Sequence, residues 1–271
     1  MLKKRVIFTL LYDNGAFMLS RNFRLQKVGN IRWLKKNYNF SKIAFSIDEL
    51  IILDVTRGNR DETRFREHVA LLTEECFVPI AAGGGVRSVE SAGVLFKSGA
   101  DKIVVNSLVY ENPAVLTDIA TEYGQQSIVA AIDIKIVNGK YVVHINNGEK
   151  RLPIDLNDWL RKMIELPVGE IYLNSMDRDG TGQGYHRELI EFLPDPMPIP
   201  VILSGGAGNY SHLLDGLREC RIDAVATAHL FNFVGDGLET ARQKLLSEGV
   251  ELAKWDLSVL SSLSQSFGSP K

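Results

Sequence analysis

Long hydrophobic runs, cysteines and an excess of charge of one sign are all scarce in this chain of 271 residues. No apolar run approaches the length that crosses a bilayer, which excludes an ordinary membrane-spanning helix. The two cysteines, Cys76 and Cys220, lie far apart in apolar surroundings, so we expect buried thiols and no disulfide framework. The formal net charge of −2 indicates neither a nucleic acid nor an anionic membrane as a partner.

The first residues have the outline of a signal peptide, because Lys3, Lys4 and Arg5 precede an apolar run. The run at 6–11 is too short for that role, Asp13 follows almost at once, and no small-residue cleavage site is present. We therefore expect a first β-strand at this place and a cytoplasmic protein.

Short β-branched runs alternate with longer amphipathic segments along the chain. The predicted strands lie at 5–11, 49–55, 78–82, 102–106, 127–133, 170–176, 199–204 and 223–228, and the predicted helices include 67–76, 88–99, 113–124 and 157–165. Near-continuous apolar strands are typical of a parallel sheet that is covered on both faces. Eight strand–helix units predict a (β/α)8 TIM barrel as a single domain over residues 1–257, followed by a polar, flexible tail over 258–271.

One interruption of this alternation has a clear local signal. Asn138 and Gly139 separate two alternating segments, and this dipeptide is typical of a type I′ hairpin. We expect a β-hairpin over 134–148, inserted after the fifth strand at the active face of the barrel. Residues 13–30, by contrast, show weak periodicity, so we expect a long mobile loop over the barrel mouth.

The two halves of the chain repeat each other at an offset of about 121–122 residues. Glu49 corresponds to Glu170, Leu11 corresponds to Asp133, and "VPIAAGGGVRS" corresponds to "IPVILSGGAGN". This offset is far longer than a solenoid repeat. It favours two half-barrels of four units each, related by a two-fold axis, with a pocket whose two ends are similar.

Two glycine-rich turns stand between a strand and a helix at corresponding places, "GGGVRS" at 83–88 and "SGGAGN" at 204–209. Glycine lets a backbone approach an anion closely, and the following helix start presents free N–H groups. Asn106 and Ser107 end the fourth predicted strand and complete the first site. The pair predicts a bisphosphate ligand, whereas neither turn has the G-x-G-x-x-G spacing of a dinucleotide site.

Carboxylates stand at the ends of several predicted strands. Asp133 ends an apolar strand and must face the mouth, where it can act as a general acid or base. Asp54, Asp177 and Asp179 are comparable candidates, each with the alternative of a purely structural role. The spacing around Asp177 imitates a calcium loop, but Gly184 breaks that pattern and we expect no metal.

Charged residues begin four of the predicted strands, namely Arg5, Glu49, Lys102 and Glu170. Such residues can form an alternating ring of ion pairs at the bottom of the barrel. The ring can be a stabilising plug or a gate through which something small enters, and the residues alone favour the plug.

Several stretches carry a family resemblance over nearly the whole chain up to about residue 250. They are "KR" 4–5, "DELIILDVT" 48–56, "GGGVRSVESA" 83–92, "GADKIVVNS" 99–107, "VAAID" 129–133, "GEIYLNSMDRDGTGQGY" 169–185 and "IPVILSGGAGN" 199–209. With these residues the chain resembles HisF, the cyclase subunit of imidazole glycerol phosphate synthase.

The resemblance implies a barrel that docks its bottom face on a HisH-type glutaminase and needs no cofactor. Ammonia released there travels through the barrel to the top, where the family's bisphosphate substrate is cleaved and cyclised. Arg5, Glu49, Lys102 and Glu170 stand at the family's ammonia-gate positions, which favours the gate over the plug. Asp101 lies where family members contact the glutaminase.

The same resemblance assigns roles at the top of the barrel. Asp133 matches one of the family's two catalytic aspartates, and Asp179 matches a supporting carboxylate. One phosphate site is matched by Gly84, Gly85, Asn106 and Ser107, and the other by Gly205, Gly206, Ala228 and position 229, which is His229 here.

The departures from the family all fall at the top. The second catalytic aspartate is replaced by Leu11, a substrate-contacting lysine by Leu19, and a phosphate-contacting serine by His229. Leucine transfers no proton, and Asp13 is expected past the strand end. The loss of one acid of a pair typically costs two to four orders of magnitude in rate.

This pattern resembles the diverged paralogues found with surface-polysaccharide genes. Those are thought to pass ammonia from a HisH-like glutaminase to a sugar amidotransferase, which turns an acetamido sugar into an acetamidino sugar. A working cyclase of histidine biosynthesis and a non-catalytic scaffold barrel are the two alternatives.

Overall fold

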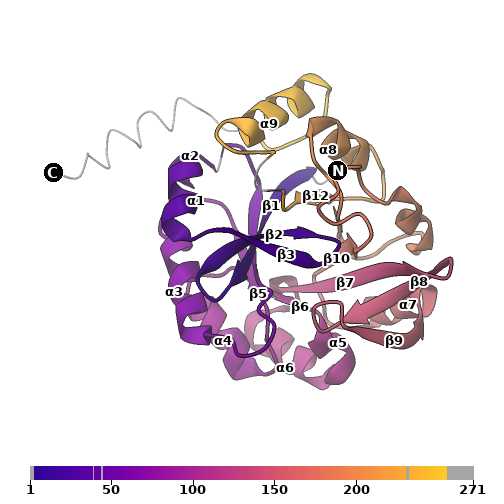
Figure 1. The fold of residues 1–271 in the computed structure, drawn as a ribbon. Helices are drawn as coiled ribbons and strands as arrows, with labels where there is room; N and C mark the ends of the chain where they lie inside the picture. Colours follow the sequence, from indigo (N-terminus) through magenta and orange to yellow (C-terminus); the bar gives the residue numbers. More distant parts are fainter. Residues whose placement is uncertain (1–2, 39, 44, 230–231, 255–271) are drawn as a thin grey trace.

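Eight parallel strands close into a barrel in the computed structural model, which describes residues 3–38, 40–43, 45–229 and 232–254 (Figure 1). The strands are β1 (Arg5–Asp13), β4 (Glu49–Asp54), β5 (Ile80–Gly83), β6 (Lys102–Val105), β7 (Ile128–Val137), β10 (Glu170–Ser175), β11 (Val201–Ser204) and β12 (Ala224–Thr227). Pairing of β12 with β1 and of β10 with β7 completes the ring. The predicted (β/α)8 barrel is confirmed, while the predicted domain boundary and the tail at 258–271 lie outside the described residues.

Helices surround this ring. They are α1 (Ile31–Asn37), α2 (Phe40–Ile43), α3 (Glu62–Thr73), α4 (Val89–Lys97), α5 (Ser107–Glu111), α6 (Ala114–Tyr123), α7 (Leu156–Glu165), α8 (Tyr210–Leu217) and α9 (Gly237–Ser247), with 3-10 turns at Gln125–Ser127 and Arg187–Phe192. The helix predicted at 67–76 begins five residues earlier, because Asp61 caps it by accepting a hydrogen bond from the Arg64 backbone N–H at 3.0 Å.

The hairpin predicted after the fifth strand is confirmed. β7 continues into β8 (Lys140–Ile145) through Asn138 and Gly139, whose φ angles of 51° and 73° are those of a type I′ turn. A third strand, β9 (Lys150–Asp155), extends it beyond the predicted end at residue 148.

The prediction of a mobile loop over 13–30 is wrong. This segment forms the hairpin β2 (Ala16–Arg21) and β3 (Arg24–Gly29), which pairs with β1 and lies across the barrel mouth (Figure 1). Asn14–Gly15, with φ angles of 41° and 92°, is the turn that leads from β1 into β2. The Asn–Gly dipeptide is a sequence signal for a hairpin turn. Phe17 and Met18 are both buried, however, so the segment lacks the alternation of apolar and polar residues that identifies a half-buried strand.

Side chains alternate between two cores along the barrel strands. Those that point outward pack against the helices, whereas those that point inward fill the barrel with a smaller apolar cluster. The inner cluster consists of Ile7, Ile51, Ala81, Val104, Val129, Tyr172, Ile202, Ala224 and Ala226. The interior of the barrel between its two ends is therefore apolar.

Other expectations about the chain are met in part. The segment after Lys4 is a barrel strand as predicted, and Arg5 donates its backbone N–H to the Asp223 carbonyl at 3.1 Å. Cys76 is buried, but Cys220 is exposed, so the prediction of two buried thiols is wrong for Cys220. No helix among the described residues is long and apolar enough to cross a membrane.

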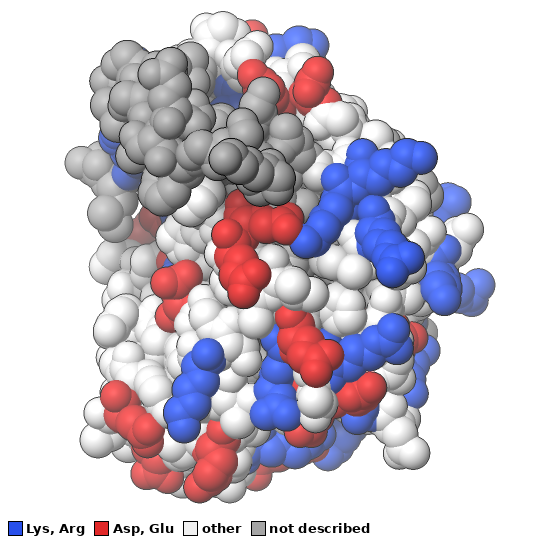
Figure 2. Space-filling view, turned by 90° about the vertical axis from the view of Figure 1, so that its left-hand side faces the viewer, with Lys and Arg blue, Asp and Glu red and all other residues white. Residues whose placement is uncertain are grey.

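The surface over α1 to α3 carries charges of both signs. Lys and Arg gather at the upper right of this view without acidic side chains among them, while the lower part mixes the two signs (Figure 2). No continuous basic face covers the side that is drawn.

Candidate functional site

A cavity of about 180 Å³ opens at the carboxyl-terminal ends of the barrel strands, beneath the two hairpins. It is lined by residues on or directly after all eight barrel strands and by the hairpin strands β2 and β3. The predicted groups that line it are Asp133, Asp179, Gly84, Gly85, Asn106, Ser107, Gly205, Gly206, Ala228 and His229. Ligand sites of (β/α)8 barrels lie at this end, so the predicted residues are brought together where chemistry is expected.

Asp133 is held by two amide side chains at the end of β7. Its Oδ1 accepts a hydrogen bond from Asn174 at 2.8 Å, and its Oδ2 accepts one from Asn106 at 3.2 Å. Burial raises the pKa of Asp133 to about 7, opposed by the Asn174 hydrogen bond and supported by the nearby charge of Asp179. A carboxyl group with this pKa exchanges a proton near neutral pH, as a general acid or base requires.

Asp179 lines the same cavity but also anchors the β2–β3 hairpin. Its carboxylate accepts hydrogen bonds from the Ser20 hydroxyl and, at 3.0 Å, from the Phe23 backbone N–H. Its backbone carbonyl accepts a third bond from the Asn22 N–H at 2.9 Å. Burial raises the pKa of Asp179, and the Ser20 and Phe23 bonds oppose that shift. Asp179 therefore fastens the tip of the hairpin across the mouth from β1.

Leu11 stands on the opposite side of the mouth from Asp133, inside an apolar cluster. Leu11 is 9% exposed and pairs in register with Met18 of β2. The whole cluster consists of Leu11, Ala16, Met18, Leu25, Leu53, Val55 and Ala228. The gap left by the missing carboxylate is thus closed with hydrocarbon.

One acid lines the cavity on this side: Asp54 at the end of β4, whose Oδ1 accepts the Thr56 N–H at 2.9 Å and whose pKa is raised by burial. Asp13 belongs to β1, contrary to the expectation that it lies past the strand end, and it accepts a hydrogen bond from the Thr56 hydroxyl at 3.0 Å. It does not line the cavity, and neither does Leu19.

The first glycine turn has the backbone of an anion loop. Gly84 and Gly85 have φ angles of 108° and 78°, and a Cβ on Gly84 would lie 2.2 Å from the Asp54 carbonyl oxygen. Only glycine fits there. The side chains of Asn106 and Ser107 are partly engaged with the protein: Asn106 donates to Ala131 O and Asp133, and the Ser107 hydroxyl accepts the Asn146 N–H at 3.0 Å.

The second turn is built alike. Gly205 and Gly206 have φ angles of 87° and 114°, and a Cβ on Gly206 would lie 2.1 Å from the Gly184 carbonyl oxygen. Ala228 and His229 form the adjoining wall. The Nδ1 atom of His229 is buried without a hydrogen-bond partner among the described residues, and burial lowers the pKa of this imidazole.

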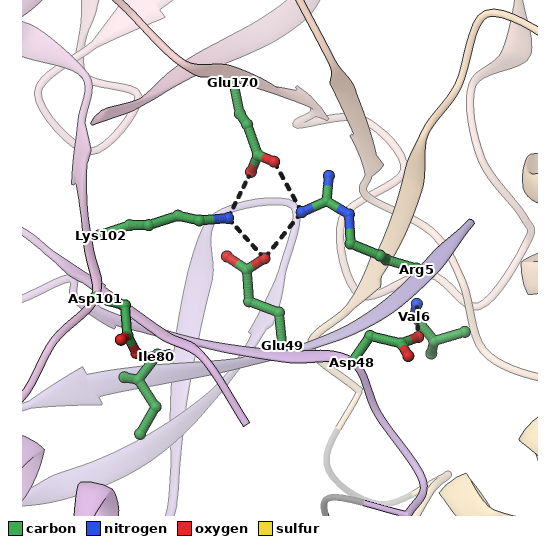
Figure 3. A network of polar contacts seen from close by, with 8 residues as sticks. All are labelled: Arg5, Val6, Asp48, Glu49, Ile80, Asp101, Lys102 and Glu170. Atoms are coloured by element: carbon green, nitrogen blue, oxygen red, sulfur yellow. Dashed lines mark hydrogen bonds and ion pairs between the residues drawn. The ribbon is translucent and has the colours of Figure 1, made fainter. Parts of the chain in front are cut away.

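The four charged strand starts form a closed ring at the other end of the barrel (Figure 3). Arg5 Nη1 lies 3.0 Å from Glu49 and 2.8 Å from Glu170, and Lys102 Nζ lies 2.9 Å from Glu49 and 3.1 Å from Glu170. Burial raises the pKa of Glu49, although both cations oppose it. Asp101 lies beside this ring, exposed, and its Oδ2 accepts the Ile80 N–H at 2.8 Å.

Between the ring and the mouth lies the inner apolar cluster with one polar layer. The Tyr172 hydroxyl accepts a hydrogen bond from the Ser204 hydroxyl at 2.6 Å and lies 3.3 Å from the Thr9 hydroxyl. Sequence reasoning missed Tyr172, and it also missed Asn174, which holds Asp133. The signal was present, because Asn174 interrupts the apolar strand "EIYLNSM".

The connection after β4 carries two arginines, Arg57 and Arg60. Arg57 donates to the Phe23 carbonyl at 2.9 Å and lies 3.5 Å from the Asn147 carbonyl oxygen, so it connects the two hairpins. Arg60 lines the cavity beside the first glycine turn.

A closed (β/α)8 barrel with two glycine-rich turns and a buried carboxyl group at its carboxyl-terminal mouth is an architecture that many small-molecule enzymes share. The family model described as "Histidine biosynthesis protein" matches residues 28–235. The chain belongs to the HisF family.

Curated relatives cover almost the whole chain. It is 49% identical over 258 residues to "Putative imidazole glycerol phosphate synthase subunit hisF2" of Parasynechococcus marenigrum (strain WH8102), which is 95% of this chain and 96% of that protein. It is 38% identical over 251 residues to "Imidazole glycerol phosphate synthase subunit HisF" of Chlorobium phaeovibrioides (strain DSM 265 / 1930), 92% of this chain and 98% of that one. A protein of the same name from Chlorobium phaeobacteroides (strain BS1) is 39% identical over 253 residues, 93% and 99% of the two chains.

Proposed function

We propose that this barrel receives ammonia from a HisH-type glutaminase and passes it to its carboxyl-terminal mouth in the cytoplasm. There the ammonia serves the amidination of an acetamido sugar in surface polysaccharide biosynthesis, together with a sugar amidotransferase. The observation that carries the proposal is the asymmetry of the mouth, where Asp133 is kept by two amides while Leu11 lies in hydrocarbon.

The two ends of the barrel support an ammonia route. The ring of Arg5, Glu49, Lys102 and Glu170 stands at the start of the barrel interior, and each of its two cations lies within 3.1 Å of both carboxylates. The apolar interior above the ring suits neutral ammonia better than ammonium, because an ion pays a large desolvation cost there. Asp101 beside the ring is available to the glutaminase on its exposed side.

The two glycine turns support a phosphorylated small-molecule ligand. Each presents a glycine turn to the same cavity, between a barrel strand and the helix that follows it. In this proposal Gly84, Gly85, Asn106 and Ser107 receive one anion, and Gly205, Gly206, Ala228 and His229 receive the other.

A second candidate is the cyclase reaction of histidine biosynthesis. The retained Asp133 and Asp179 and the two anion loops favour it, as do the names of the Chlorobium relatives. The missing acid at position 11 argues against it, since cyclisation in this family uses a pair of aspartates.

Cyclisation of the family's bisphosphate substrate with an ammonium salt distinguishes the two candidates. We expect the wild-type chain to turn over two to four orders of magnitude more slowly than the Chlorobium phaeovibrioides relative. Leu11→Asp should recover part of that rate, whereas the polar but proton-inert Leu11→Asn should not. A wild-type rate equal to that of the relative would remove the amidination proposal and leave the cyclase.

The glutaminase partnership has its own test. Co-expression with the HisH-type glutaminase from the same genome should give a heterodimer on a sizing column. Asp101→Lys, which reverses an exposed charge beside the ring, should weaken that complex, whereas Asp118→Lys on the outer helix α6 should not. Separate elution of the two wild-type chains would refute the ammonia route.

A further inference from the structure

Arg60 places a positive charge at the first anion loop. It stands in the connection between β4 and α3, lines the cavity, and its side chain is only 22% exposed. A Cβ on Gly85 would lie 2.8 Å from its Nη1 atom, so the guanidinium lies directly against the glycine turn.

The hydrogen-bonding capacity of this guanidinium is unused. Its Nε is buried without a hydrogen-bond partner, and no donor of Arg60 has one among the described residues. Its charged neighbour is Asp54, whose Oδ2 lies 3.7 Å from Nε, too far for a hydrogen bond. Asp54 instead uses Oδ1 to accept the Thr56 N–H at 2.9 Å. Buried donors are nearly always satisfied, so an orphaned donor on a side chain that lines a cavity indicates a group supplied from outside.

The neighbouring arginine shows that this is particular to Arg60. Arg57 lines the same cavity, but it donates to the Phe23 carbonyl and lies 3.7 Å from Glu149. Its Nη2 atom is engaged with the two hairpins.

At the second turn, no arginine or lysine of the described residues lines the cavity. At the offset of about 121 residues, Arg57 corresponds to Arg178, but Arg60 corresponds to Thr181. The wall of the second turn carries the imidazole of His229 instead, whose pKa is lowered by burial. The two anion loops therefore have similar backbones and different charges.

We propose that Arg60 is a specificity-determining residue that grips a phosphate monoester together with the Gly84–Gly85 turn. A guanidinium presents parallel N–H donors that match two oxygens of a phosphate dianion, while the turn supplies backbone N–H groups to the others. The first loop then binds the more highly charged end of the ligand, and the second loop binds its other end more weakly. This deepens the proposed function, on which it rests, by naming the chemistry of one ligand group.

The test is a titration of the intact chain with inorganic phosphate at constant ionic strength, followed by the backbone amide resonances of Gly85 and Gly206. Each loop is thus observed separately in one protein. Wild type should saturate at Gly85 at a lower phosphate concentration than at Gly206. Arg60→Gln should raise the phosphate concentration needed at Gly85 about tenfold, which is the effect of losing one charge-assisted bond, and leave Gly206 within twofold.

Two further variants keep this result interpretable. Arg60→Lys retains the positive charge but lacks the two parallel N–H donors of the guanidinium. It should lose less phosphate affinity than Arg60→Gln. Arg66→Gln removes an arginine of α3 that does not line the cavity, and it should leave both loops within twofold.

Two outcomes overturn the proposal. The first is a Gly85 response that is unchanged within twofold in Arg60→Gln. The second is a wild-type chain in which phosphate moves neither amide; it would remove the phosphorylated ligand of the proposed function as well, whereas the heterodimer test of the ammonia route would stand unaffected. If Arg60→Gln does not fold, a crystal of the wild type in phosphate decides, because an oxygen within hydrogen-bond distance of Arg60 supports the proposal and an anion placed elsewhere contradicts it.

Discussion

The mouth ends of β1 and β7 are the same structural element in two copies, yet they differ in chemistry. Both strands open a half-barrel, and both continue through an Asn–Gly turn into an antiparallel hairpin. At corresponding positions β1 carries Leu11 among apolar side chains, and β7 carries Asp133 between two amides.

The comparison shows that the backbone and the chemistry of a duplicated element vary separately. The turn, the hairpin and the glycine loop persist because each depends on backbone geometry. The acid depends on a single side chain and on the groups that solvate it. Without a carboxylate at this position, close packing of apolar side chains gives the lowest free energy, and the cluster around Leu11 has this packing.

The largest expected effect comes from placing a carboxylate on β1. Leu11→Asp removes apolar packing and buries a charge, so it should lower the free energy of unfolding by about 3–5 kcal/mol at pH 8. Urea denaturation measures this loss. A variant as stable as wild type would show that the β1 side of the mouth already solvates a charge. The contrast between an apolar β1 end and a polar β7 end would then be wrong.

Leu11→Asn is the matched control for that variant. It loses the same packing without a charge, so its cost should not vary with pH. The extra cost of Leu11→Asp should be present above the unfolded pKa of aspartate, near 4, and should disappear as pH falls below it.

Removal of the carboxylate from β7 should act in the opposite direction. The pKa of Asp133 is about 7 in the folded chain and near 4 when unfolded, so wild type loses stability as pH rises from 4 to 7. Asp133→Asn should therefore be more stable than wild type by about 2–4 kcal/mol at pH 8, and the difference should shrink towards pH 4. Urea denaturation across this range decides, and a difference that is constant with pH would contradict the raised pKa.

The smallest effect concerns the two Asn–Gly turns. Gly139→Ala introduces only the strain of a positive φ, since no atom lies within 4 Å of the new Cβ, and should cost about 1 kcal/mol. Gly15→Ala has the same strain and must also displace the Arg64 side chain, which would lie 2.4 Å away, so it should cost more. Thermal unfolding measures the stability loss of both variants. A larger stability loss for Gly139→Ala than for Gly15→Ala would contradict the prediction and would mean that the β1 hairpin is the less ordered one.

Much of the fold and part of the candidate site could be predicted from the sequence, and each wrong or missing prediction has a physical cause. The eight strands and the two glycine turns were predictable because apolar runs and glycines are local signals. The β2–β3 hairpin was not predicted, because the mouth buries Phe17 and Met18 together and removes the alternation of a strand. Asn174 and Arg60 were not identified as site residues, because their importance lies in which atoms they do or do not contact.

The order of residues by itself determined the barrel, the duplicated halves, and the contrast between Leu11 and Asp133. These features follow from hydrophobic periodicity and from single residues at strand ends, which need no knowledge of distant partners. Only the tertiary structure decided that Arg5, Glu49, Lys102 and Glu170 close into one ring and that the buried Nε of Arg60 has no hydrogen-bond partner among the described residues. The reason is that closure and register of the sheet bring together residues from distant strands, and hydrogen-bond satisfaction depends on those distances.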